Sequence, residues 1–293
     1  KEPLQKHYVS RRSRSQKGVL VFLARDTEQR VMCYSNAHVT KSEQADEILR
    51  FVQFWEQQTG QAPQELVFDS QLTTYANLHR LDAQGIRFLT LRRRTRKLLA
   101  EIYARPSSAW RRVTLRSLTR TYRTPRVFDE RICLRDYGDK LIRQLSILDL
   151  GHEEPTILIT NDMRATPATL ITRYAQRMLI ENGIAEAIHF FHIDALSSMV
   201  GLKVDFDLQL TLAASSLYRL FAQRLPENYH HATAKVLFDS LLDVAGKVQI
   251  ENSQIVVTLD KRAHNPYLVD SGLADHPTPM PWLDGKELVI EFA

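Results

Sequence analysis

The sequence predicts an α/β fold in which a mixed sheet is flanked by helices and interrupted by a β-rich insertion. Three observations lead to this prediction. Two apolar runs are joined by a short polar turn within residues 18–36, strand patterns then alternate with helical patterns as far as residue 97, and short strand-like segments fill residues 98–160. A tight turn joins antiparallel strands, whereas strands separated by helices favour parallel pairing, so the sheet should contain both arrangements.

The first elements follow from local patterns. Residues 18–24 (GVLVFLA) and 30–36 (RVMCYSN) predict a hairpin, and the polar residues 1–17 predict no strand ahead of it. Apolar residues at helical spacing predict a helix over residues 42–57. Gly60 and Pro63 end this helix, and the short strand at residues 65–68 (ELVF) leads directly to Asp69.

The remaining elements are predicted in the same way. A helix is expected over residues 75–84 and a strand over 86–91, and within the β-rich segment the clearest strands are 142–148 and 156–160. Helical periodicity returns at Pro167 and continues past Ile188. Further on we expect helices over 206–225 and 231–244, a hairpin over 248–259 and an irregular segment over 263–284.

These patterns divide the chain into four predicted segments. The first half of the core covers residues 1–97, the β-rich insertion 98–160, the second half of the core 161–203, and a region of helices and a hairpin 204–293. The chain begins with lysine in a polar stretch typical of the middle of a protein, so we expect it to be part of a longer one.

Composition excludes several classes of protein. No apolar run approaches the roughly 20 residues that cross a bilayer, and no signal-peptide pattern follows Lys1, so we expect a cytoplasmic protein without membrane contact. The two cysteines, Cys33 and Cys133, have no Cys or His neighbours at metal-ligand spacing. They are predicted to be reduced structural thiols, and no zinc site is expected.

Positive charge is concentrated in one part of the chain. Residues 87–143 contain 17 Lys and Arg against five Asp and Glu, an excess of 12, whereas the whole chain carries only +5. The rest of the chain is therefore negative. A coherent basic surface of this kind favours a polyanionic partner such as DNA, and the alternative is an ordinary solvated basic face.

Two places carry carboxylates that suit catalysis. Asp69 lies at the end of a buried strand, although such aspartates are more often helix caps or turn residues, with Ser70 and Thr73 as possible caps beside it. Tyr174, Arg177 and Glu181 follow the spacing Tyr-x2-Arg-x3-Glu, which places them on one face of a helix. The alternative for this second group is a simple surface ion pair between Arg177 and Glu181.

Tyr174, Arg177 and Glu181 resemble the first three elements of the YREK signature of bacterial insertion-sequence transposases, which have an RNase H-like fold and a DDE catalytic triad. The resemblance extends to VFDSQLTTYANL at residues 67–78, GIRFLTLRRR at 85–94 and ITND at 159–162, and covers most of residues 18–200. It implies a β-rich insertion before the glutamate helix, which agrees with the segment 98–160.

The sequence departs from this family pattern at two places. Ile188 stands where the signature has its lysine, so one DNA contact is missing. No strand is predicted where the family has its first aspartate, and Asp26 falls in the hairpin turn at the wrong edge for catalysis. We therefore expect the first aspartate upstream of Lys1, and the chain alone to be inactive.

The resemblance implies a DNA transposase that cleaves transposon ends and transfers the strand to target DNA by phosphoryl transfer. Asp69 and Glu181 would hold Mg²⁺ or Mn²⁺, because hard cations prefer oxygen ligands. Tyr174 and Arg177 would contact double-stranded DNA, together with the basic run Arg92, Arg93, Arg94, Arg96 and Lys97. The resemblance also allows a homodimer in the DNA complex. The alternatives are a non-catalytic DNA-binding protein derived from a transposase and a metal-dependent nuclease without strand transfer.

Overall fold

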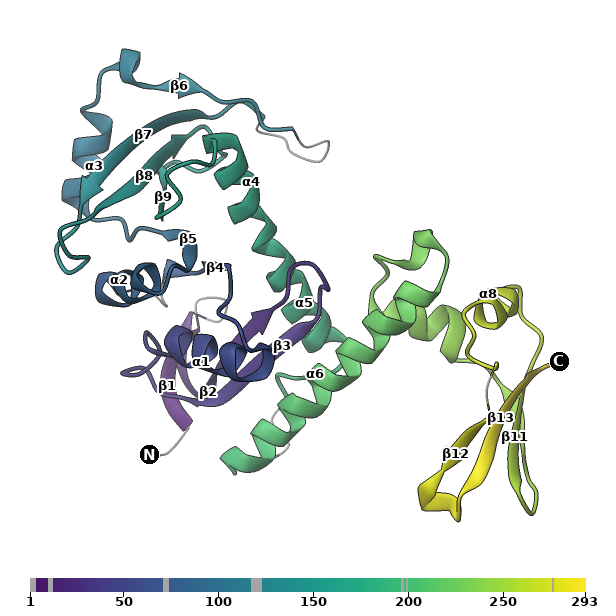
Figure 1. Cartoon of the computed structure of the whole chain (residues 1–293). Coiled ribbons are helices and arrows are strands. Elements are labelled where there is room, and N and C mark those ends of the chain that lie inside the picture. Colours follow the sequence, from purple (N-terminus) through teal and green to yellow (C-terminus); the bar gives the residue numbers. More distant parts are fainter. Residues whose placement is uncertain are drawn as a thin grey trace. The chain divides into compact units, whose positions relative to one another are not determined.

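The chain is described by a computed structural model over residues 4–9, 13–70, 74–116, 123–195, 198, 200–275 and 277–293. It forms two compact units, which Figure 1 shows along the chain. The first comprises Lys1–Phe22 and Asn36–Asn182, and the second Leu23–Ser35 and Gly183–Ala293. No helix in the described ranges is long and apolar enough to cross a membrane.

A three-stranded sheet begins the chain, in the order β1 (Leu4–Val9), β2 (Arg14–Arg25) and β3 (Met32–Val39). The prediction that no strand precedes Gly18 is wrong. Leu4 pairs with Val19 and Val9 with Arg14, so β1 and the start of β2 form an antiparallel pair within the polar stretch. Backbone hydrogen bonds hold such a pair, and a sheet with one face in water needs few apolar side chains there.

The main sheet has six strands in the order β4-β5-β9-β8-β7-β6. β4 and β5 are parallel and the remaining neighbours are antiparallel, as predicted for a mixed sheet. The bounds are Glu65–Phe68 for β4, Arg87–Leu91 for β5, Arg111–Arg112 for β6, Arg126–Cys133 for β7, Leu141–Leu148 for β8 and Thr156–Thr160 for β9. Residues 98–160, marked as β-rich by the sequence, supply four of these strands after an unpredicted helix, α3 (Arg96–Tyr103).

Helices cover both faces of this sheet, because successive strand residues point to opposite sides. On β5, Phe88 packs with α1 (Glu47–Thr59) and α2 (Tyr75–Ala83), while Leu89 packs with α4 (Pro167–Gln176). On β9, Ile157 packs with α3. The sheet thus lies between α1, α2 and α3 on one side and α4 on the other (Figure 1), and the predicted α/β fold with flanking helices is confirmed.

The helix after β9 differs from the prediction. One helix was expected from Pro167 past Ile188, but α4 ends at Gln176 and α5 (Met178–His189) begins after a one-residue interruption at Arg177. Around the interruption the N–H of Arg177 donates to the carbonyl of Tyr174, and the N–H of Ile180 donates to that of Arg177. These bonds span three residues, as in a 3₁₀ turn.

The second unit contains the remaining elements. Its apolar core joins α6 (Gly201–Arg224), α7 (Ala234–Leu237) and the π-helical turn Phe238–Leu242 that continues α7. The predicted hairpin is confirmed as β10 (Gly246–Ile250) and β11 (Gln254–Leu259). The prediction of an irregular segment at 263–284 is wrong.

Residues 263–284 contain α8 (Asn265–Asp270) and β12 (Thr278–Met280). An unpredicted strand, β13 (Lys286–Phe292), pairs in parallel with β11 and antiparallel with β12. Because β11 and β13 are separated by more than twenty residues, neither strand's local pattern predicts the partner. The segment looks irregular in sequence since its order comes from this pairing.

Candidate functional site

Asp69 follows the last residue of β4, and it is not the residue that caps the next helix, α2. The N-cap of α2 is Thr74, whose side chain accepts a hydrogen bond from the N–H of Asn77. Thr73, the other cap suggested by the sequence, lies outside the described residues. Ser70 donates its hydroxyl to the Oδ1 of Asp69 at 3.3 Å, and the Asp69 side chain is 45% exposed. Asp69 is thus presented to solvent beyond the strand.

The start of α4 is fixed to the sheet by Arg143. This arginine lies on β8 within a run of buried residues, and its guanidinium donates to both carboxylate oxygens of Asp129 at 2.9 and 2.6 Å. Its remaining nitrogen donates to the carbonyls of Asp162 and Ala165 at 3.1 and 2.6 Å. Arg143 therefore joins the sheet to the loop that leads into α4. Although it belongs to the basic segment 87–143, it does not contribute to a basic surface.

Asp162 completes this loop. Its Oδ1 accepts hydrogen bonds from the N–H groups of Arg164 and Ala165, both at 2.9 Å. Burial acts to raise the pKa of Asp162, but these bonds and the nearby Arg173 outweigh it, so the pKa is lowered. Arg173 on α4 contacts Asp162 at 3.2 Å and Glu65, the first residue of β4, at 3.1 Å. The helix is thus tied to the strand that leads to Asp69.

One guanidinium connects the two predicted catalytic carboxylates. Nη2 of Arg177 lies 2.7 Å from Oε1 of Glu181, and Nη1 lies 3.7 Å from Oδ2 of Asp69. The Arg177 side chain is 21% exposed and that of Glu181 is 48% exposed. The structure therefore brings Asp69 together with Arg177 and Glu181, which lie more than one hundred residues later in the sequence.

Tyr174 lies against the same arginine. The Arg177 guanidinium carbon is 5.4 Å from the centre of the Tyr174 ring, a cation–π distance. Burial raises the pKa of the Tyr174 phenol, the Arg177 charge opposes this, and the Asp69 and Glu181 charges add to it. Within the described residues, the Tyr174 hydroxyl and the Nε of Arg177 are buried and have no hydrogen-bond partner.

The chemistry of this group suits a hard cation only in part. Two carboxylates, each about half exposed, offer oxygen ligands and leave room for water, which fits Mg²⁺ or Mn²⁺. In the described portion of the chain, however, no three His, Cys, Asp or Glu residues come close enough together to hold a metal. β1 carries no acidic residue, so it does not add a third carboxylate. Among the described residues, the candidate metal site therefore consists of the two carboxylates of Asp69 and Glu181.

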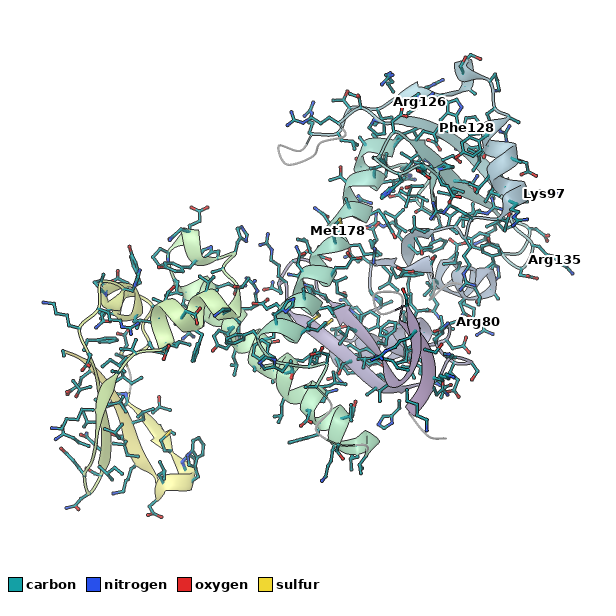
Figure 2. The ribbon with its side chains drawn as sticks, turned by 180° about the vertical axis from the view of Figure 1, so that it is seen from behind. Arg80, Lys97, Arg126, Phe128, Arg135 and Met178 are labelled. Carbon is teal, nitrogen blue, oxygen red and sulfur yellow. The ribbon has the colours of Figure 1, made fainter. Side chains whose placement is uncertain are left out.

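The predicted basic run divides into engaged and available side chains. Arg92 donates to the Oε1 of Gln144 at 2.5 Å, and Arg94 contacts Glu154 at 2.9 Å. Arg93, Arg96 and Lys97 are exposed and have no hydrogen-bond or ion-pair partner among the described residues. Figure 2 shows Lys97 at the outer side of α3.

Arg143, Asp129, Asp162 and Arg173 were missed as positioning residues. The only local signal was Arg143, because a charged residue inside the apolar strand LIRQLSIL requires a buried partner. Its partners lie on β7 and in the loop before α4, and they can be identified only once the order of the strands in the sheet is known. In the sequence, Asp162 appears only as the last residue of the segment ITND, with no predicted role.

Comparison with known proteins supplies one finding. Residues 3–217 match the family described as "Transposase DDE domain", a match that covers most of the chain and ends within α6. No curated protein matches the chain.

Proposed function

Because the chain belongs to the family of transposases with a DDE domain, we propose that Asp69 and Glu181 are two of its catalytic carboxylates. The observation that carries this proposal is the meeting of Asp69 and Glu181 at the Arg177 guanidinium. Arg173 on α4, the helix that precedes α5, contacts Glu65 of β4, and the fold agrees with the RNase H-like fold that the resemblance implies. Family membership also implies DNA binding.

In this proposal the reaction is phosphoryl transfer at transposon ends followed by strand transfer to target DNA. Asp69 and Glu181 would hold Mg²⁺ or Mn²⁺, which when bound activates the attacking oxygen and stabilises the leaving oxygen. The chain itself positions the carboxylates and binds the DNA backbone. Tyr174 and Arg177 lie beside the carboxylates, where a planar guanidinium suits a phosphate.

The available basic residues are suited to contacts with the DNA backbone. Arg96 and Lys97 occupy the first turn of α3, which contains no acidic residue. Positive side chains at the positive end of a helix dipole are unfavourable alone, whereas an anion such as phosphate makes the arrangement favourable. Arg93, Arg96 and Lys97 are therefore proposed as phosphate contacts, and Arg92 and Arg94 as residues whose charges are partly engaged within the fold.

Metal-dependent cleavage of transposon ends tests the carboxylates. Asp69→Asn and Glu181→Gln, made in the protein as its gene encodes it, are each expected to abolish cleavage with Mg²⁺ or Mn²⁺. Asp26→Asn is the matched control, because Asp26 is a carboxylate in the turn after β2 whose Oδ1 accepts from the N–H of Gln29. Cleavage retained by both Asp69→Asn and Glu181→Gln would refute the assignment.

A second function is a transposase-derived protein that binds DNA without cutting it. The concentration of positive charge in residues 87–143 and the presence of only two carboxylates at the described site favour it. It predicts duplex binding that weakens steeply with salt and no metal-dependent cleavage of any DNA. A single turnover assay on transposon ends separates the two functions.

A further inference from the structure

Arg177 occupies the place between two carboxylates that a metal ion is proposed to take. Its two terminal nitrogens face different partners, Nη2 toward Glu181 and Nη1 toward Asp69. Two carboxylates brought together without a cation repel each other. The guanidinium removes this repulsion, so it stabilises the arrangement of the carboxylates in the protein without DNA.

This contact is suited to being broken. Asp69 and Glu181 are both about half exposed, and exposed ion pairs are weak and screened by salt. The third guanidinium nitrogen, Nε, is buried and makes no hydrogen bond of good geometry among the described residues, and the Tyr174 hydroxyl beside it interacts with Arg177 only weakly. Poorly paired buried groups are costly, so the arginine gains free energy in a position where Nε forms a better hydrogen bond.

We infer that Arg177 is a built-in counter-ion of the carboxylate pair, displaced when a divalent cation binds Asp69 and Glu181, and that its release couples metal binding to DNA binding. The inference rests on the proposed function. A guanidinium released from the carboxylates is free for a phosphate, so each ligand favours the state that the other needs. By linkage, DNA then raises the affinity for the metal by the same factor by which the metal raises the affinity for DNA.

Direct metal binding tests this coupling without measuring cleavage. Mn²⁺ affinity is measured by electron paramagnetic resonance, first without DNA. Arg177→Gln is expected to bind Mn²⁺ about tenfold more tightly than the unchanged protein, since two weak ion pairs no longer compete. Arg135→Gln is the control for net charge, because Arg135 is exposed and has no ion pair among the described residues. It is expected to leave the affinity unchanged.

A second measurement adds a short non-cleavable duplex. The duplex is expected to raise the Mn²⁺ affinity of the unchanged protein several-fold and to have much less effect on Arg177→Gln, in which the competing charge is already gone. Circular dichroism checks that each variant is folded. Equal or weaker Mn²⁺ binding by folded Arg177→Gln in the absence of DNA would overturn the inference.

Asp69→Asn separates this inference from the proposed function. Combined with Arg177→Gln, it is expected to abolish the tight Mn²⁺ binding. If the double variant binds as tightly as Arg177→Gln, the ion does not lie on Asp69 and the proposed function fails with the inference. If Asp69→Asn removes Mn²⁺ binding while Arg177→Gln does not tighten it, the carboxylate assignment stands and the counter-ion role fails. Absence of Mn²⁺ binding in every variant at millimolar concentration contradicts both.

Discussion

Replacing Arg143 by alanine tests whether this residue fixes the entry to the signature helix. Arg143 is 7% exposed and makes four hydrogen bonds, two to the Asp129 carboxylate and two to the carbonyls of Asp162 and Ala165. The hydrogen bonds to Asp129, and to a lesser extent the Asp129 charge, raise the pKa of Arg143, so the arginine stays protonated at any working pH. Alanine removes all four bonds and leaves the carboxylate and two carbonyls without this donor.

The expected cost follows from these partners. Breaking a buried ion pair by removing one member costs about 3–5 kcal/mol. The Asp129 side chain is 35% exposed, so water replaces part of the lost interaction and the lower end applies. We therefore expect Arg143→Ala to lower the free energy of unfolding by about 3 kcal/mol. Arg143→Lys should recover part of this loss, because an ammonium keeps the charge but cannot reproduce the bidentate geometry.

Urea unfolding followed by tryptophan fluorescence measures this change. Trp55 and Trp110 belong to the same unit as Arg143, whereas Trp282 in the other unit is already 74% exposed and reports little. Arg126→Ala is the matched control, since Arg126 makes a bidentate contact with Asp149 at 2.7 and 3.1 Å on the surface. Arg143→Ala no more destabilising than Arg126→Ala would refute the positioning argument.

Three further predictions concern other parts of the fold. Asp162→Ala should lower the free energy of unfolding by about 1–3 kcal/mol at pH 7. Because the folded-state pKa of Asp162 is lowered, this contribution is present above pH ~4 and is lost as pH falls through the folded pKa. The acid unfolding curves of the variant and the parent should therefore converge. Iodoacetamide at pH 8 should label exposed Cys133 much faster than Cys33, because burial raises the pKa of the Cys33 thiol to about 11, and equal rates would contradict this. Gly138→Ala should destabilise by about 1 kcal/mol in thermal unfolding, since φ is +81° and the new Cβ would lie 3.1 Å from the His79 ring, whereas no loss would contradict the strain.

The strands of the main sheet could be predicted because their local pattern agrees with their environment. Residues 65–68, 86–91, 142–148 and 156–160 are short segments rich in apolar and β-branched residues, and they become β4, β5, β8 and β9 with shifts of one residue or less at their bounds. Strands buried on both faces are mostly apolar, so the signal is strong even where single polar residues such as Arg143 interrupt it.

β1 and β13 could not be predicted in this way. β1 lies in a polar stretch, and its hydrogen bonds go to the backbone of β2, which constrains side-chain chemistry little. β13 takes its place beside β11 through a parallel pairing across an intervening helix and strand. Each of these strands is stabilised by pairing with another strand, and the local sequence pattern does not show which strand that is.

The interruption at Arg177 was also hidden from the sequence. No proline or glycine stands between Pro167 and Asn182, and the usual sequence causes of a helix break are absent there. The apolar periodicity continues across the interruption, so a pattern of spacing predicts one helix. What differs at this point is the side chain of Arg177, which is held by carboxylates from two elements.

From the sequence, a simple surface ion pair between Arg177 and Glu181 is the alternative to a catalytic role for these residues. In the structure the pair exists, and it includes Asp69 from the end of β4. An i,i+4 contact on a helix surface would satisfy both partners by itself, yet here the arginine is shared with a third residue more than one hundred positions away. The surface pair and the site are therefore one arrangement, and its explanation must account for Asp69 as well as for helical spacing. Spacing predicted which residues share a helix face, and only the packing of α4 against the sheet through Arg143 and Arg173 determines which strand end they meet.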